Sequence, residues 1–312
     1  MVSEKSGSGY GHKAYKLNKI LLLGAIGFLF FAIGVLIFVI SYTRSSITAE
    51  KREIIQVLNE GNFEQAYILS KNALRNNPVN YFLLTTNGFS AYQLGISQID
   101  SQSRLYYIDR SIISLRKALL HREAANDGDL HYVLGKAYYF KGAYHVDLAI
   151  KHLEIADSLS HDARDIPEFL GLLYASIGDY RRSVEAFARA FVPGNPPADR
   201  LLLAIARSYF ALEEFDMAKN YLRRCIDTSF DSNLINEAHF LLAEIYININ
   251  DFNNAERQLF SILENTGENA EARFRLGELY NLQGDTTRAR AEWRLAVRQD
   301  PAHVRARARL NI

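Results

Sequence analysis

The sequence is short of cysteine, of proline and of net charge, and each shortage excludes a class of protein. Cys225 is the single cysteine among 312 residues, so no disulfide can form within the chain and a cysteine-based zinc site is excluded. Six prolines and the lack of any low-complexity tract are typical of a folded chain. A formal net charge of +1 gives no reason to expect a nucleic-acid partner.

Motifs that carry catalysis are also missing. The sequence contains no H-E-x-x-H, P-loop, C-x-x-C or G-x-S-x-G pattern. Five of the eight histidines fall within 41 residues, yet none are four apart: His121, His131, His145, His152 and His161. We therefore expect surface or interhelical histidines, no metal, no cofactor and no small-molecule substrate. Cys225 is expected to be a buried hydrophobe. A protein without enzymatic activity is the prediction, and an enzyme is the minor alternative.

One long apolar run lies near the N-terminus. Residues 20–40 contain 21 residues without a charged or strongly polar side chain. As a helix rising about 1.5 Å per residue, the run would span about 30 Å, the thickness of a bilayer's hydrocarbon core. It is longer than the apolar region of a cleavable signal peptide, and no good A-x-A-like site follows it. We therefore expect a retained transmembrane helix, with a cleaved signal or a buried core helix as alternatives.

The charges beside this run predict its orientation. Residues 1–19, a basic flexible tail, hold four lysines and one glutamate, while Arg44, Lys51 and Arg52 follow the run. The more basic flank usually stays in the cytoplasm. We expect a single-pass membrane protein with a cytoplasmic N-terminus and a short linker at residues 41–46. The rest of the chain would be extracytoplasmic, which in a bacterium means periplasmic.

The remainder of the chain repeats a pattern of tyrosine, turn and small residue. The repeated tyrosines lie 35, 37 and 34 residues apart: Tyr174, Tyr209, Tyr246 and Tyr280. Small residues are expected to face each other across two helices, as Gly171 faces Ser183 and Gly277 faces Ala289. Glycine can end the first helix in a left-handed conformation at Gly178 and Gly284. Four residues can then cap the second helix: Asn62, Asp179, Asp251 and Asp285.

This pattern closely resembles the tetratricopeptide repeat family, whose units are helix–turn–helix hairpins of about 34 residues. The resemblance implies an all-α fold: an N-terminal transmembrane helix followed by a right-handed α-solenoid of about seven hairpins at residues 47–303, with a capping helix at 304–312. The units would lie near residues 47–80, 81–127, 128–163, 164–198, 199–235, 236–269 and 270–303. The first three fit less well. In the second, the second helix is expected to resume only near Ser111, after an expanded loop.

The resemblance also implies where a partner would bind. First helices of successive units line the concave side of such a solenoid. The family's groove positions fall here on Tyr132, Lys136, Tyr139, Phe140, Glu168, Leu172, Leu203, Arg207, Phe210, Phe240, Glu244, Ile247, Phe274, Glu278 and Asn281. Aromatic and aliphatic residues with a few charges are typical of a groove that binds a peptide or a helix. The alternative is that several of the aromatics pack between adjacent repeats. Some chaperone-linked members clamp a carboxylate with lysine and asparagine, and the glutamates here exclude that clamp.

Arginines dominate the last stretch of the chain. Arg305, Arg307 and Arg309 are expected to give the terminal helix the polar outer face that a solenoid end needs. A site for an acidic partner is the alternative, and it would add Arg288, Arg290, Arg294 and Arg298. The chain resembles bacterial inner-membrane tetratricopeptide proteins that assist secretion, envelope assembly or large motor complexes. It is expected to be an adaptor or scaffold for envelope or membrane proteins. A structural subunit binding through its convex face and ends is the alternative.

Overall fold

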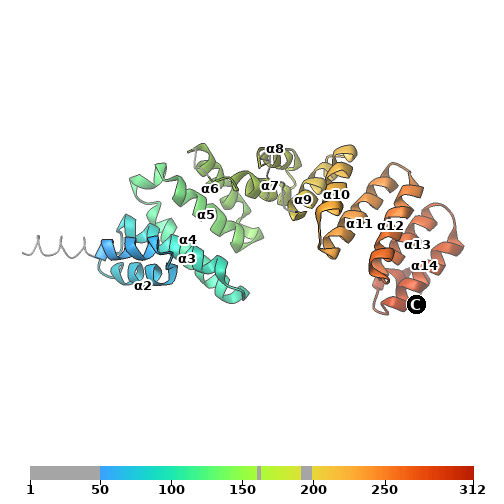
Figure 1. Cartoon of the computed structure of the whole chain (residues 1–312), viewed down its shortest axis with the longest axis horizontal. Helices are drawn as coiled ribbons and strands as arrows, with labels where there is room; N and C mark the ends of the chain where they lie inside the picture. Colours follow the sequence, from blue (N-terminus) through green and yellow to red (C-terminus); the bar gives the residue numbers. More distant parts are fainter. Residues whose placement is uncertain (1–49, 160–162, 191–198) are drawn as a thin grey trace, which may run out of the picture.

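A computed structural model describes residues 50–159, 163–190 and 199–312. These residues form helices joined by short turns, and no strand occurs among them. The helices stack as successive antiparallel pairs along one elongated, curved array (Figure 1). The expected all-α repeat solenoid is therefore confirmed. The predicted transmembrane helix at residues 20–40 lies outside the described residues, and within the described ranges no helix has the length and apolar character that a membrane crossing requires.

Seven helix pairs follow one another in the described part of the chain. Helical residues 50–59 pair with α2 (Phe63–Ala73), and α3 (Tyr81–Ser97) pairs with α4 (Ser101–Ala118). The next pairs are α5 (Gly128–Lys141) with α6 (Val146–Ser158), α7 (Ile166–Ser176) with α8 (Tyr180–Ala190), and α9 (Asp199–Ala211) with α10 (Phe215–Thr228). The last are α11 (Ser232–Asn248) with α12 (Phe252–Thr266) and α13 (Ala270–Leu282) with α14 (Thr286–Gln299). A short α15 (Val304–Leu310) follows, and η1 (Arg122–Asn126) and η2 (Ala143–His145) are 3₁₀ turns.

The turns within the pairs use the residues that the sequence singled out. Gly178 and Gly284 adopt left-handed φ angles of 79° and 82°. The predicted side-chain caps are also confirmed, because each accepts a backbone N–H three residues later: Asn62, Asp179, Asp251 and Asp285. The turn between α9 and α10 differs. Glu213 holds the left-handed position there with φ 61°, and Glu214 provides no side-chain cap.

Within a pair, a glycine of the first helix packs against a large side chain of the second helix. A Cβ at Gly171 would lie 2.5 Å from the Phe187 ring, and one at Gly277 would lie 2.4 Å from the Trp293 ring. Small residues of the second helix were expected opposite these glycines. Ser183 does donate to the Gly171 carbonyl at 2.8 Å, but the volume of the missing Cβ is filled by Phe187. The glycine is needed because close packing leaves no space for a methyl group.

Three of the four repeated tyrosines, Tyr174, Tyr246 and Tyr280, bond to the second helix of the preceding pair, whereas Tyr209 stacks on Tyr221 of its own pair. The Tyr174 hydroxyl donates to Oε1 of Glu154 on α6 at 2.6 Å, and the Tyr280 hydroxyl donates to Oε1 of Glu256 on α12 at 2.5 Å. Both rings are nearly fully buried. The regular spacing of tyrosine along the sequence therefore reflects a regular interface between neighbouring hairpins.

The second pair departs from the expectation of an expanded loop. Its helices are 17 and 18 residues long, and only residues 98–100 join them. The extra residues lengthen both helices because the short connection is well capped. Oδ1 of Asp100 accepts the Ser103 N–H at 2.7 Å, and the Arg104 guanidinium donates to the Gln98 carbonyl at 3.0 Å.

A buried amide ties the first two pairs together. Nδ2 of Asn87 on α3 donates to the Ser70 hydroxyl of α2 at 3.0 Å and to the Tyr67 carbonyl at 3.2 Å. Its Oδ1 accepts from the Ser114 hydroxyl of α4 at 2.8 Å. The irregular asparagine in the second repeat is thus a satisfied polar link between three helices.

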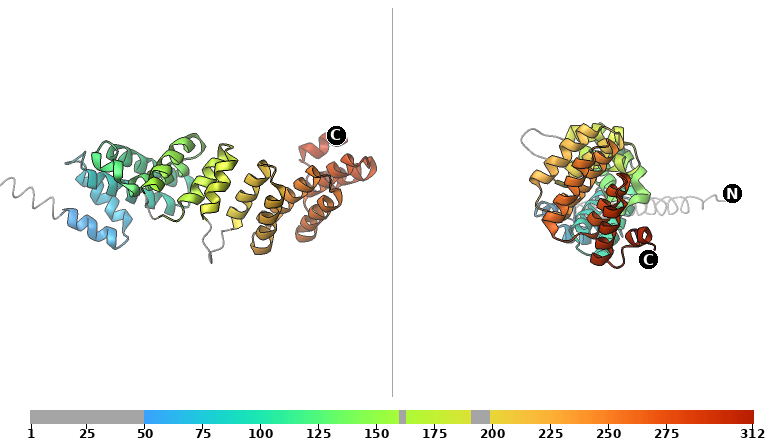
Figure 2. Two further views of the ribbon diagram at one scale, coloured as in Figure 1. Left: turned by 90° about the horizontal axis from the view of Figure 1, so that it is seen from above. Right: turned by 90° about the vertical axis from the view of Figure 1, so that its right-hand side faces the viewer.

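First helices form the inner side of the curve. Helix α3 contacts α5, α5 contacts α7, α7 contacts α9, and α9 contacts α11, whereas the second helices make no comparable contacts among themselves in the described ranges. The array is long in one direction and narrow when viewed along it (Figure 2). The surface lined by the first helices is therefore the concave one, as expected for this architecture.

Candidate partner-binding surface

The residues predicted for the groove lie on the first helices, but their exposure varies. Most are half-buried. Arg207 and Glu244 are exposed. Leu203 and Phe274 were expected to be exposed, but they are buried, with only 3% and 6% of their surface exposed. The predicted groove is therefore not a uniform open surface, and its parts differ in what surrounds them.

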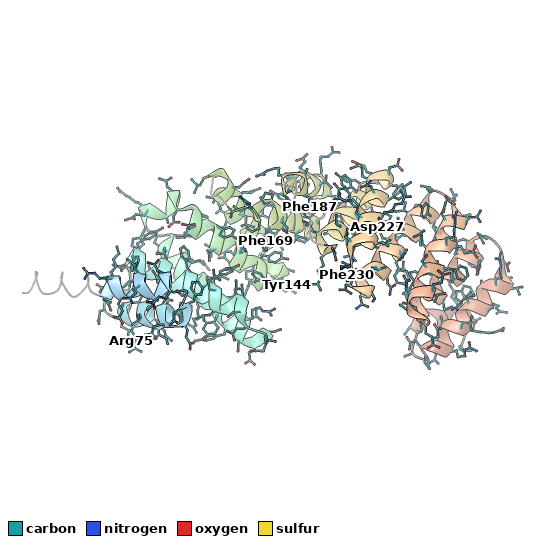
Figure 3. The ribbon with its side chains drawn as sticks, viewed as in Figure 1. Arg75, Tyr144, Phe169, Phe187, Asp227 and Phe230 are labelled. Atoms are coloured by element: carbon teal, nitrogen blue, oxygen red, sulfur yellow. The ribbon has the colours of Figure 1, made fainter. Side chains whose placement is uncertain are left out.

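In the middle of the array the groove residues bind their neighbours. We name as the central cluster Tyr132, Lys136, Tyr139, Phe140, Asp165 and Phe169. Nζ of Lys136 lies 2.7 Å from Oδ2 of Asp165, and the Tyr132 hydroxyl donates to Oδ1 of Asp165 at 2.9 Å. Nζ of Lys136 also lies 4.6 Å from the centre of the Phe169 ring, which is labelled in Figure 3. Side chains of α5 thus interact with Asp165 and α7 across the boundary between two repeats.

Aromatic rings complete this cluster. Tyr139 and Phe169 meet edge to face with ring centres 4.9 Å apart, and Phe140 lies 6.3 Å from Tyr92 of α3. Burial, together with the hydrogen bond to Asp165, raises the pKa of Tyr132. Burial and the neighbouring Asp165 charge raise the pKa of Glu168. The packing of groove aromatics between repeats, which was left open as an alternative, is what occurs here.

The predicted groove residues of α7 and α9 interact mainly with their own neighbours, although Arg207 is exposed. Leu172 packs against the buried group formed by Phe187, Leu201 and Ile205. Arg207 pairs with Glu237 of α11, with Nη2 and Oε2 2.6 Å apart. Leu203 belongs to the buried core that continues into the last hairpins, and Phe210 packs against that core.

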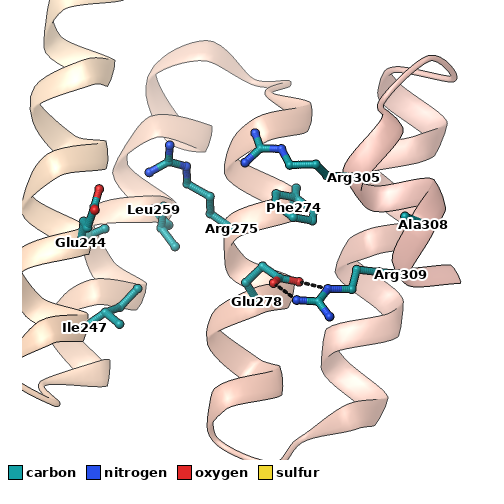
Figure 4. A pocket seen from close by; sticks show the side chains of 10 residues that line it. Glu244, Ile247, Leu259, Phe274, Arg275, Glu278, Arg305, Ala308 and Arg309 are labelled. Carbon is teal, nitrogen blue, oxygen red and sulfur yellow. Dashed lines mark hydrogen bonds and ion pairs between the residues drawn. The ribbon is translucent and has the colours of Figure 1, made fainter.

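A pocket opens near the C-terminal end of the concave side (Figure 4). Its volume is about 660 Å³. Four predicted groove residues line it: Glu244, Ile247, Phe274 and Glu278. Six other residues complete it: Ala243, Leu259, Arg275, Arg305, Ala308 and Arg309. We call this site the C-terminal pocket, and helices α11, α12, α13 and α15 all contribute to it.

Two acidic residues of α13 hold α15 against the pocket. Glu278 receives a two-pronged contact from Arg309, at 2.9 Å from Nε and 2.5 Å from Nη2. Glu271 pairs with Arg305 at 2.5 Å and with Arg275 at 2.7 Å. Burial alone would raise the pKa of Glu271, but the hydrogen bonds and charges of Arg275 and Arg305 lower it overall.

This arrangement adds a role to the terminal arginines. Arg305, Arg307 and Arg309 are exposed, as expected for the polar outer face of a cap, but Arg305 and Arg309 also reach α13 and line the pocket. The Arg307 guanidinium donates instead to the carbonyl groups of Pro301 and Ile312. The missed signal is in the spacing. Glu271 and Glu278 are seven residues apart and Arg305 and Arg309 are four apart, so each set lies on one face of its helix.

The open part of the pocket combines an apolar floor with charges of both signs. Ile247, Leu259 and Phe274 provide apolar lining. Within the described residues, no ion pair involves the Glu244 carboxylate. Arg275 lies 4.5 Å from the centre of the Phe240 ring, and its guanidinium keeps donors beyond the one that binds Glu271. The site can therefore bind an apolar side chain between a cationic and an anionic group.

His131, His152 and Cys225 lie where they support structure. His131 and His152 are buried between α5 and α6 with their Nδ1 atoms 2.9 Å apart. Burial, followed by the His131 charge, lowers the pKa of His152 to about 4. Cys225 is fully buried, and burial raises the pKa of its thiol to about 11. No group of three or more metal-ligating side chains occurs in the described ranges.

Comparison with known proteins identifies the repeats. Residues 174–312, which include the C-terminal pocket, match the model of the family described as tetratricopeptide repeat-like domain. The structure is similar to that of the C-terminal part of a TPR repeat-containing protein from Cytophaga hutchinsonii, with a TM-score of 0.60, 14% identity, and coverage of 84% of this chain and 100% of the other. PilW, a widely conserved type IV pilus biogenesis factor, is similar with a TM-score of 0.54, 16% identity, and coverage of 72% and 98%. The search of curated proteins gave no match. At these identities the two structures share the fold alone, a solenoid of helix hairpins of the tetratricopeptide type, and the family model matches the C-terminal part of the chain.

Proposed function

We propose that this protein is a membrane-anchored adaptor that binds a protein partner in the C-terminal pocket. The observation that carries the proposal is the contrast in free surface along the groove. In the central cluster the polar and aromatic groups bind residues of neighbouring repeats. In the C-terminal pocket, Glu244 and part of the Arg275 and Arg305 guanidinium groups remain accessible to a ligand. Concave sites with an apolar lining and a few placed polar groups are typical binding sites.

The chemistry of the pocket suggests a peptide segment as the ligand. An aliphatic or aromatic side chain would contact Ile247 on the side of the pocket toward α11. A lysine or arginine of the partner would reach Glu244, and a carboxylate would reach Arg275 or Arg305. Because α11 and α13 both present their groove faces, an extended or helical segment could lie between them.

Anchoring and compartment form the second part of the proposal. The apolar run at residues 20–40 and the basic residues before it support a single membrane crossing, with the solenoid on the extracytoplasmic face. A partner in the envelope follows from that placement. A reporter fused after Ile312 tests it, since activity confined to the extracytoplasmic side is expected and a cytoplasmic signal would contradict it.

Photo-crosslinking from the full chain in intact cells tests the binding site. A photoreactive amino acid replaces Ala308, which is exposed and lines the pocket, and the matched control replaces Ala291, which is exposed on α14. The proposal expects one discrete adduct from position 308 that disappears with Glu244→Arg. Persistence of the adduct in Glu244→Arg, or its absence, would contradict the proposal.

A structural subunit is the second candidate, and one observation favours it. Arg290, Arg294 and Arg298 are exposed at intervals of four residues on α14, and no ion pair joins any of them to another described residue. Such a basic face could contact an acidic neighbour in an assembly. In the same crosslinking experiment, an adduct from position 291 without one from position 308 would favour this candidate.

A further inference from the structure

The α3–α4 pair extends beyond what the stacking of repeats requires. Its helices have 17 and 18 residues, against 11 in α2 and 14 and 13 in the next pair. The pair consequently protrudes from the array (Figure 1). Four apolar side chains lie at its end and are exposed, and we call them the apolar tip: Ile96, Ile99, Leu105 and Tyr106.

The apolar tip is held in a fixed shape. Ile99 is 97% exposed, yet the backbone around it is well bonded. Arg104 donates to the Gln98 carbonyl at 3.0 Å, the Gln98 amide donates to the Leu94 carbonyl at 3.0 Å, and Asp100 caps α4. The isoleucine at the end of this ordered projection leaves apolar surface in contact with water, and the packing of the repeat does not require it.

Two basic side chains of α4 lie beside the tip, Arg104 and Arg110, whereas Arg116 and Lys117 lie in the last turn of that helix. Of the acidic groups nearby, Asp109 pairs with Lys141 and Asp100 serves as a cap, while Glu64 is exposed and lines the cleft beside the end of α3. The guanidinium of Arg110 lies 5.2 Å from the centre of the Tyr106 ring. Aliphatic residues and a tyrosine with flanking arginines are the composition of a surface that enters the interface of an anionic bilayer.

The position of the tip in the chain brings it near the predicted anchor. The Gly61–Glu64 turn and residues 93–97 at the end of α3 line one cleft. The tip therefore lies beyond the end of the helix formed by residues 50–59 that is farther from residue 50, and this helix is itself about 15 Å long. Residues 41–49 can span about 30 Å when extended. The bilayer surface around residue 40 is thus within reach of the tip.

We infer that the apolar tip rests in the headgroup region of the bilayer that holds residues 20–40, so that the first repeats have a second contact with lipid. The inference depends on the proposed membrane anchor. A lipid surface suits the tip because it accepts a projecting apolar group without a preformed cavity, and anionic headgroups complement the arginines of α4.

An environment-sensitive dye on the full-length chain tests this inference. Cys225→Ala removes the native thiol, and alanine already fills the equivalent position in other repeats, such as Ala296. Ile99→Cys then carries the label, and Tyr144→Cys provides the matched control in the turn of the next pair. Tyr144 is fully exposed (Figure 3). Both proteins are reconstituted in nanodiscs of phosphatidylcholine and phosphatidylglycerol, with and without spin-labelled lipid.

The expected result is a blue-shifted emission from position 99 that spin-labelled lipid quenches, with neither effect at position 144. An unquenched label at 99 in a chain that co-elutes with the nanodisc would overturn the inference and leave the anchor standing. A chain that does not co-elute would overturn the anchor and the inference together. Shielding of position 99 only after envelope proteins are added would assign the tip to a protein partner and overturn the lipid contact.

Discussion

The central cluster and the C-terminal pocket are built from the same groove positions, yet one is closed and the other open. In the centre, Lys136 and Tyr132 meet Asp165, which immediately precedes α7. At the C-terminal end, Glu278 and Phe274 interact with α15 and leave the side toward α11 accessible. A groove position is therefore available to a partner only when the adjacent repeat carries no complementary residue for it.

The largest expected effect comes from the glycine beneath each region. Gly277→Ala would bring a methyl within 2.4 Å of Trp293, and Gly171→Ala would bring one within 2.5 Å of Phe187. We expect a local loss of about 2–3 kcal/mol in each case. Hydrogen exchange followed by mass spectrometry should show faster exchange in α13 and α14 for Gly277→Ala, and in α7 and α8 for Gly171→Ala. If one variant accelerated exchange equally in both pairs of helices, the two regions would not be independent, contrary to this expectation.

Acid should weaken the central region first. The folded-state pKa of His152 is about 4, below the ordinary value of 6.5, because burial disfavours its charged form. Its contribution to stability is therefore complete above pH 6.5 and is lost as the pH falls from 6.5 towards 4. At pH 5 the loss should reach about 2 kcal/mol at most. After correction for the slower intrinsic exchange at lower pH, the protection factors of α5 and α6 should fall between pH 7 and pH 5, and His152→Phe should make that fall smaller.

A matched pair of alanine variants sharpens the contrast between closed and open positions. Lys136→Ala leaves the half-buried Asp165 without its cation, so we expect a loss of about 1 kcal/mol. Glu244→Ala removes an exposed carboxylate and should change the midpoint of thermal unfolding very little. Circular dichroism measures both. A larger loss for Glu244→Ala than for Lys136→Ala would mean that the pocket is the more tightly coupled surface.

The smallest expected effect is a gain in stability at the turn between α9 and α10, which lies between the two regions. Glu213 holds a left-handed φ of 61°, which favours glycine. Glu213→Gly should therefore stabilise α9 and α10 by about 0.5 kcal/mol. Asn250→Gly is the control, because asparagine tolerates this conformation better and the gain should be smaller there. Thermal unfolding of the two variants decides, and a loss for Glu213→Gly would contradict the expectation.

The sequence allowed the repeats to be predicted because their signals are local. Tyrosines about 35 residues apart, glycines such as Gly178 and caps such as Asp285 each act within one hairpin or across one boundary. The expanded loop before Ser111 was wrong for a related reason. No proline or glycine lies between Ser97 and Ser111, and the position of the turn is set by Asp100, which caps α4.

The candidate site was predictable only in part, because exposure depends on neighbours. Glu244 and Ile247 were placed in the groove and do line the pocket. Phe274 was placed there too, but His303 and Arg305 cover it from a segment about thirty residues away in sequence. Arg275 was missed because its role arises from its position between Phe240 and Glu271. Such contacts are fixed by packing between repeats, which a single-repeat pattern does not encode.

Asn87 has a consequence for how this chain can vary. Its amide is matched to Ser70 on one side and to Ser114 on the other, inside a dry interior where an unmet polar group is costly. If the first or second hairpin were replaced by a later one, the Asn87 amide would lose hydrogen-bond partners. The initial two hairpins are therefore one structural unit and cannot be replaced separately by a later hairpin.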